Sequence, residues 1–81
     1  RSHGTLSCGE SVAEAFLRIF FLERACTMQV KALSGGRKLV TPSDAVQDVV
    51  TKQSAGICKI ADLSWTALLR MLDRKNPGYA D

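Results

Sequence analysis

Histidine and cysteine are the residues of this chain that could act as metal ligands or nucleophiles, and few of them are present. The single histidine, His3, precedes Gly4, and the three cysteines are Cys8, Cys26 and Cys58. A lone histidine beside a glycine is, on composition alone, more often a hydrogen-bonded structural residue than a metal ligand. The cysteines form no CxxC pair, which argues against a disulfide framework and for reduced thiols in a cytosolic protein. A zinc site of His3, Cys8 and another cysteine matches no common zinc spacing.

Motifs typical of enzymes are missing from these 81 residues. The sequence holds no Gly-rich phosphate loop, no nucleophile elbow and no pair of histidines at metal-binding spacing. Gly35-Gly36 is better explained as the end of a helix than as a phosphate cradle. Because His3 is the only histidine, a catalytic triad or a three-histidine metal site needs residues from outside this chain.

Charge and hydropathy exclude two classes of protein. Eleven basic and eight acidic residues give a net charge of +3, and they are scattered rather than gathered with aromatic residues, as a nucleic-acid surface requires. The longest apolar run in the most hydrophobic segment, residues 19–22, is far shorter than the roughly twenty residues that cross a bilayer. The sequence therefore predicts binding to neither nucleic acid nor membrane.

The segment from Ser11 to Leu33 must position whatever chemistry lies before it. It contains no glycine or proline, and its apolar residues recur at three- and four-residue spacing, which predicts a long amphipathic helix buried on two sides. Ser11 is expected to cap the first turn, and Glu14 to reach back to the Ser11 amide in a capping box. Gly35-Gly36 should end this helix, and Cys26 should be a small buried hydrophobe within it.

Shorter elements surround this helix. Residues 5–8 alternate polar and apolar side chains, as a half-buried strand does, and Gly9-Glu10 forms the turn into the helix. A second helix is expected to begin with Thr41 as N-cap and Pro42 in the first helical position. A third is expected from about residue 62 to residue 75, followed by a mobile C-terminal tail.

The length of the chain bounds its organisation. Eighty-one residues allow one domain with a marginal core. The sequence starts with Arg1 rather than methionine, and its first four residues look like the end of a motif. We therefore expect residues 1–81 to be the C-terminal portion of a single domain whose N-terminal portion is missing.

Several short runs form a recognisable set. They are His3-Gly4, Gly9, Ala13–Phe16, Leu22-Glu23, Ala25-Cys26, Gln29, Leu68–Arg74 and Asn76–Tyr79. Together they resemble the C-terminal half of the class II aldolase/adducin family, whose members show an Asn-His-Gly motif, a short strand and then a long helix. The likeness covers nearly the whole chain.

This resemblance implies a fold. Members of the family are α/β proteins with a three-layer α/β/α domain around a central, largely antiparallel sheet. This chain would supply one strand and the C-terminal helices of such a domain. The family is also usually homotetrameric, with active sites at subunit boundaries, so the resemblance implies a homotetramer.

The resemblance also implies a metal site. Family enzymes hold a zinc ion with three histidines, and His3 matches the third of them; another divalent metal is the alternative. The metal polarises a carbonyl and stabilises an enediolate, while an upstream glutamate moves protons. Ser2 replaces the common asparagine before this histidine. Tyr79 is a catalytic candidate, because a phenol in a C-terminal tail can donate a proton to a reacting oxygen.

Three functions follow from these features. The first is a cytoplasmic, zinc-dependent aldolase or epimerase-type lyase of carbohydrate metabolism, acting on a sugar phosphate or a related hydroxy-carbonyl compound. The alternative is a non-catalytic, adducin-like protein-interaction domain that keeps the fold without the site. A third alternative is a free-standing protein of three helices.

Overall fold

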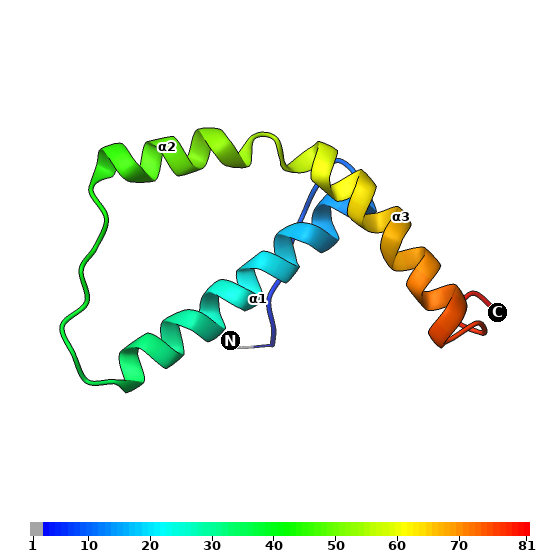
Figure 1. The fold of residues 1–81 in the computed structure, drawn as a ribbon, viewed down its shortest axis with the longest axis horizontal. Helices are drawn as coiled ribbons and strands as arrows, with labels where there is room; N and C mark the ends of the chain where they lie inside the picture. Colours follow the sequence, from blue (N-terminus) through cyan, green and yellow to red (C-terminus); the bar gives the residue numbers. More distant parts are fainter. Residues whose placement is uncertain (1–2) are drawn as a thin grey trace.

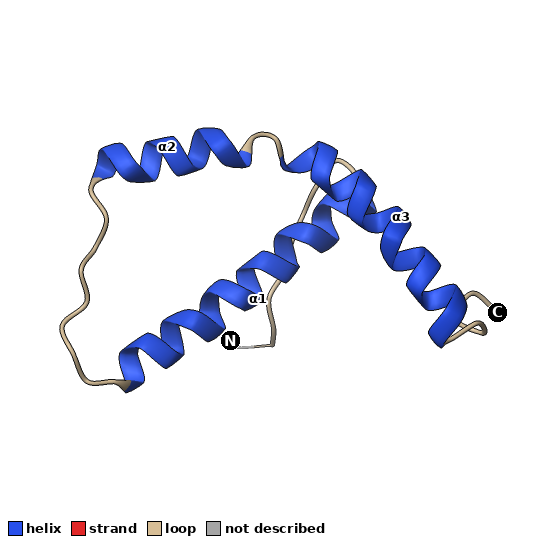
Figure 2. Ribbon diagram, in the orientation of Figure 1, coloured by secondary structure: helices blue, strands red, loops and turns tan. Residues whose placement is uncertain are grey.

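The structure, a computed structural model, describes residues 3–81 and consists of helices and loops (Figures 1 and 2). The helices are α1 (Val12–Ser34), α2 (Asp44–Ser54) and α3 (Ile57–Lys75). The main contact between helices joins α1 and α3, which cross near the start of both (Figure 1). Helix α2 contributes no buried residue.

Local sequence signals determine the two ends of α1. The Ser11 hydroxyl accepts a hydrogen bond from the Glu14 amide at 3.1 Å, as the N-cap prediction requires. The Glu14 carboxylate accepts the amide of Glu10 at 3.0 Å rather than that of Ser11, so the predicted capping box is displaced by one residue. After the helix, Gly36 has a φ of 69°, a left-handed conformation that glycine adopts at little cost. The predicted stop is confirmed.

The starts of α2 and α3 differ from their predictions. The N-cap of α2 is Ser43, whose hydroxyl accepts the Val46 amide at 3.4 Å, so Thr41 is not the cap. Serine is at least as good an N-cap as threonine, and Asp44 then lies favourably at the positive end of the helix dipole. Helix α3 begins at Ile57, before the predicted position, because its first turns pack on α1. Its end at residue 75 is confirmed.

The expected fold class is wrong for the part of the chain that the structure describes. We expected a three-layer α/β/α domain in which residues 5–8 form a strand, but residues 3–81 contain helices and no strand. A strand is defined by hydrogen bonds to a neighbouring strand. Residues 5–8 have no such neighbour among the described residues and instead lie against the first turns of α1, through the Ser7 hydroxyl and the Cys8 carbonyl.

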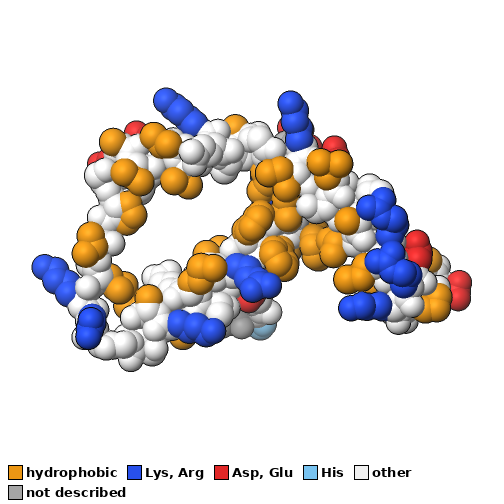
Figure 3. All heavy atoms as spheres, in the orientation of Figure 1, with side chains coloured by type: hydrophobic (Ala, Val, Ile, Leu, Met, Phe, Trp, Pro, Cys, Tyr) orange, Lys and Arg blue, Asp and Glu red, His pale blue; other side chains and the backbone are white. Residues whose placement is uncertain are grey.

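The core is a small cluster at the crossing of α1 and α3. Its buried members are Ala13, Leu17 and Ala61, and Ile57 and Trp65 pack against them. Small residues at the crossing allow the two helices to approach closely, and hydrophobic side chains gather around this point (Figure 3). The cluster therefore joins α1 and α3 at their crossing.

Most of the apolar surface of α1 lies outside this cluster. Phe21 is 51% exposed and Met28 is 66% exposed, and Cys26 is exposed as well. The prediction that α1 is buried on two sides, with Cys26 inside, is therefore wrong for this chain. The apolar face of α1 is wider and longer than α3 covers, and α2 buries none of its own residues.

The shape of the molecule reflects this small core. Its radius of gyration is 16.4 Å, whereas a compact domain of this length has a radius of about 12 Å. Among the described residues, no helix combines the length and the apolar character needed to cross a lipid bilayer.

Candidate functional site

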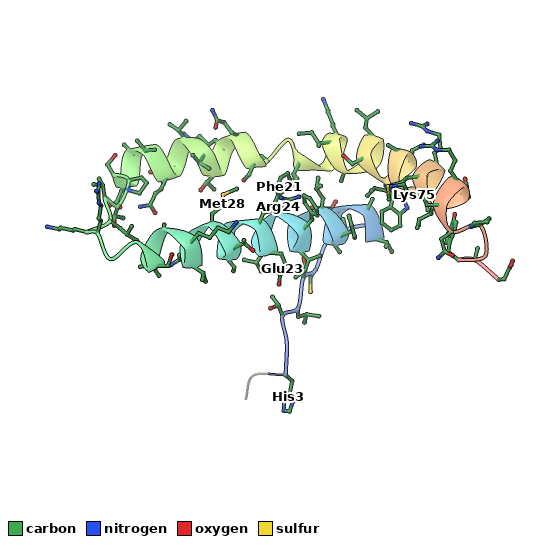
Figure 4. The ribbon with its side chains drawn as sticks, turned by 60° about the horizontal axis from the view of Figure 1, so that its bottom comes forward. His3, Phe21, Glu23, Arg24, Met28 and Lys75 are labelled. Carbon is green, nitrogen blue, oxygen red and sulfur yellow. The ribbon has the colours of Figure 1, made fainter. Side chains whose placement is uncertain are left out.

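His3 lies near the end of an extended segment that precedes α1. We call residues 3–10 the arm; it runs away from the helices and carries an exposed His3 at its far end (Figure 4). Gly4 has a φ of 145°, and no atom lies close enough to clash with an added Cβ. The glycine is therefore needed for its backbone conformation rather than for space. Ser2, the departure from the family motif, lies outside the described residues.

The base of the arm is fastened to the first turns of α1 by three hydrogen bonds. The Ser7 hydroxyl donates to the Ala15 carbonyl at 3.0 Å. The Arg18 guanidinium donates through Nη1 to the Cys8 carbonyl at 2.9 Å. The amide of Glu10 donates to Oε2 of Glu14 at 3.0 Å. Since the partners all lie on α1, the direction in which the arm leaves is set by that helix.

Glu14 is the only buried charged residue among those described, with 3% of its surface exposed. Its Oε1 accepts a hydrogen bond from Nη2 of Arg18, and the two side chains form an ion pair. Its Oε2 accepts a hydrogen bond from the Glu10 amide. A buried carboxylate needs such partners, because burial without them is costly. Sequence reasoning found Glu14 as a capping residue and missed Arg18, although Glu and Arg four residues apart on a helix are a known pairing.

The described residues do not form a metal site by themselves. No three or more of the described His, Cys, Asp and Glu side chains come together in a way that could hold a metal ion, so His3, Cys8 and Cys26 do not form the alternative zinc site. The side chain of Cys58, the other cysteine considered for that site, lies outside the described part of the structure. The exposed imidazole of His3 on an extended arm is, however, accessible to a metal bound jointly with ligands from outside residues 3–81. The imidazole of His3 is thus free to act as one ligand of a site that other residues would have to complete.

Tyr79 follows α3 in a turn, where its amide donates to the Asn76 carbonyl at 3.0 Å. Its hydroxyl donates to Oδ1 of Asp73 at 3.3 Å. Partial desolvation raises the pKa of Tyr79, and the charge of Asp73 and the hydrogen bond to it raise that pKa further. The turn after α3 and the arm that bears His3 lie in different parts of the molecule (Figures 1 and 4). The structure does not bring these two predicted site residues together within one chain.

Comparisons with known proteins agree with the sequence motifs. The family model described as the Class II Aldolase and Adducin N-terminal domain matches residues 1–30. A Caulobacter vibrioides protein named "Putative aldolase class 2 protein" is 53% identical over 100% of this chain and 32% of its own length. A Pseudomonas aeruginosa protein of the same description is 42% identical over 96% of this chain and 32% of its own length.

The chain is also similar to adducins. Human beta-adducin is 37% identical over 98% of this chain, which corresponds to 12% of the adducin. No solved structure matches the chain significantly. The chain spans about a third of the length of the two bacterial relatives, 32% in each case.

Proposed function

We propose, because this chain belongs to the class II aldolase and adducin family, that it is part of a metal-dependent lyase of the aldolase or epimerase type. Its substrate would be a sugar phosphate or a related hydroxy-carbonyl compound. The observation that supports this proposal best is the exposed His3, held on an arm that is fastened to α1. The 53% identity to a protein named "Putative aldolase class 2 protein" supports the same reaction class.

We further propose that residues 1–81 form the C-terminal portion of a longer class II aldolase/adducin-like domain. The coverage of 32% of the bacterial relatives supports this. So do the large apolar side chains that the described residues leave exposed, since surface of this kind usually marks a contact with another part of a protein. Leu63 on α3 is 76% exposed and Val30 on α1 is 67% exposed. The remaining ligands of the metal would lie in the rest of that domain.

His3 would hold zinc or another divalent metal through its imidazole. A bound metal of this kind would polarise a substrate carbonyl and stabilise negative charge on its oxygen. The role of this chain would be to present the imidazole of His3 at a fixed place. The Gly4 conformation and the hydrogen bonds of Ser7 and Cys8 to α1 support that role.

Tyr79 is proposed as a proton donor in the same reaction. A tyrosine phenol is protonated at neutral pH and therefore has a proton to donate. Partial desolvation and Asp73 raise the pKa of Tyr79, so the phenol keeps this proton to a higher pH than an ordinary tyrosine does. Replacing Tyr79 with phenylalanine should lower kcat while metal content stays unchanged. Unchanged turnover in Tyr79→Phe would remove this residue from the mechanism.

We also propose that the protein acts as a homotetramer in the cytoplasm. The exposed apolar side chains of α1 and α3 support subunit contacts, because burial of such surface drives association. The free thiols of Cys8 and Cys26 support a reducing compartment. Sedimentation of the full-length protein would measure the assembly directly.

The decisive experiment is metal analysis of the full-length protein with His3 intact and with His3→Ala. We expect one divalent ion per chain in the first protein, and loss of that ion and of lyase activity in the second. Cys8→Ala is a matched control, because Cys8 contacts α1 through its main-chain carbonyl, and it should retain both. A folded protein that binds no divalent ion with His3 intact would overturn the proposal.

The second candidate is a non-catalytic interaction domain. It is favoured by the 37% identity to human beta-adducin over 98% of this chain. Under this hypothesis the arm and helices form a binding surface, and the full-length protein holds no divalent metal through His3. The metal analysis therefore separates the two functions.

A further inference from the structure

The arm is held much more firmly at its base than a turn into a helix requires. The Ser11 hydroxyl already caps the first turn of α1, yet Ser7, Cys8 and Glu10 each add a hydrogen bond to the same helix. These three contacts involve successive parts of the arm and end four residues short of His3.

Gly9 shows how closely the base of the arm lies on α1. A Cβ added there would be 2.8 Å from the amide nitrogen of Ala15 and 3.1 Å from Cβ of Glu14. The first distance is shorter than real Cβ contacts, and its partner is a backbone atom that cannot move aside. Close packing at Gly9 and the three hydrogen bonds therefore act together to fix residues 7–10 on the helix.

Arg18 links the two polar parts of this contact. Its Nη1 donates to the Cys8 carbonyl of the arm, and its Nη2 donates to the buried carboxylate of Glu14. Glu14 in turn accepts the Glu10 amide. A planar guanidinium with several donors suits such a bridge, whereas a lysine ammonium lacks the fixed fork.

We propose that Arg18 is a positioning residue for the metal ligand His3. It touches neither the metal nor the substrate; it holds the base of the arm so that the imidazole is presented in one direction. This inference rests on the proposed function of His3. Without Arg18 the arm samples more directions, and metal binding must then oppose the conformational entropy of ordering it.

The test compares Arg18→Gln with Arg24→Gln in the full-length protein. Arg24 is the matched control because it is an arginine on the same helix whose guanidinium lies over the ring of Phe20, 5.1 Å from its centroid. Zinc affinity is measured by competition with a chromogenic chelator, and the Co²⁺-substituted protein is examined by visible absorption. We expect Arg18→Gln to bind zinc about tenfold more weakly, within the range for residues that orient metal ligands, and to alter the Co²⁺ spectrum. Arg24→Gln should change neither.

Two further variants keep the test sharp. Arg18→Lys retains the charge that pairs with Glu14, so it should recover part of the lost affinity. Ser7→Ala removes only the hydrogen bond to Ala15 and should weaken zinc binding by a few-fold even if Arg18→Gln fails to fold, which circular dichroism would reveal.

The outcomes separate the two proposals. A wild-type protein that binds zinc through His3, together with a folded Arg18→Gln variant of unchanged affinity and unchanged Co²⁺ spectrum, would overturn the positioning role alone. Unchanged zinc binding in Ser7→Ala would do the same if Arg18→Gln does not fold. A wild-type protein whose zinc binding is unaffected by His3→Ala would instead overturn the proposed function, and the positioning role with it.

Discussion

Replacing Gly9 with alanine tests the packing of the arm on α1 without removing any hydrogen-bonding side chain. The new methyl group would lie 2.8 Å from the Ala15 nitrogen and 3.1 Å from Cβ of Glu14, so either the helix or the arm must shift. Adding a methyl group to a tightly packed site typically costs about 1–3 kcal/mol. If the arm instead moves away, it loses the Ser7 and Arg18 hydrogen bonds, each contributing about 1 kcal/mol. Both routes predict a loss of about 1–3 kcal/mol.

The measurement is urea unfolding of the full-length protein, followed by circular dichroism and extrapolated to water. Gly35→Ala is the matched control, because Gly35 has a φ of −72° and its added Cβ would be 3.6 Å from the nearest atom, the Ala32 carbonyl oxygen. That substitution should be neutral or should stabilise by about 0.4–1 kcal/mol, since it restricts the unfolded chain. If Gly9→Ala falls within about 0.5 kcal/mol of wild type, the usual range for surface substitutions, the close approach of arm and helix is refuted.

Three other perturbations test the remaining structure. Ala61 is 1% exposed at the crossing of α1 and α3, so Ala61→Leu should lower the free energy of unfolding by about 1–3 kcal/mol in the same assay. Ala67 lies at an exposed position of α3. An equal effect from Ala67→Leu would contradict the tight packing at the crossing. Desolvation and the neighbouring carboxylate of Asp73 both raise the pKa of Tyr79 above its ordinary value of 10.0. Asp73→Asn removes the carboxylate and should lower that pKa part of the way toward 10.0. The absorbance difference between each protein and its Tyr79→Phe version isolates this titration. Since the folded pKa lies above the unfolded value, stability linked to Tyr79 should be present below pH 10 and lost as pH rises through the folded pKa; a titration unaffected by Asp73→Asn would disprove the contact. Finally, the 81 residues alone should bind the dye ANS and unfold at low urea, because so little of their apolar surface is buried; a cooperative, dye-free fragment would show that they form a complete domain.

Signals confined to a few neighbouring residues predicted the structure well. Ser11 caps α1, the glycine pair after residue 34 ends it, and α3 stops at residue 75. Each of these features depends on backbone groups within one turn, so the sequence contains all the partners involved. The start of α2 was missed because Thr41 and Ser43 are both acceptable caps two residues apart, and local chemistry alone does not choose between them.

Features that depend on distant partners were not predictable in the same way. Residues 5–8 alternate polar and apolar side chains as a strand does. A strand also needs a neighbouring strand to hydrogen-bond with, and the described residues contain none. The breadth of the apolar face on α1 was recognised, yet its burial depends on what covers it, and α3 covers only the first turns. The sequence thus predicted which surface is apolar and overestimated how much of it these residues bury.

The candidate site likewise contains one residue that the sequence identified, His3, and one that it missed, Arg18. His3 was identified by its resemblance to a family motif, and its place at the end of an arm follows from the local conformation of Gly4 and the cap of α1. Arg18 was missed because its partner on the arm is a main-chain carbonyl, that of Cys8, and a carbonyl has no signature in a sequence. Residues that orient a site through the backbone are therefore the ones that sequence reasoning overlooks. Substitution of Arg18 can therefore test a metal-binding role of His3 without removing the imidazole itself.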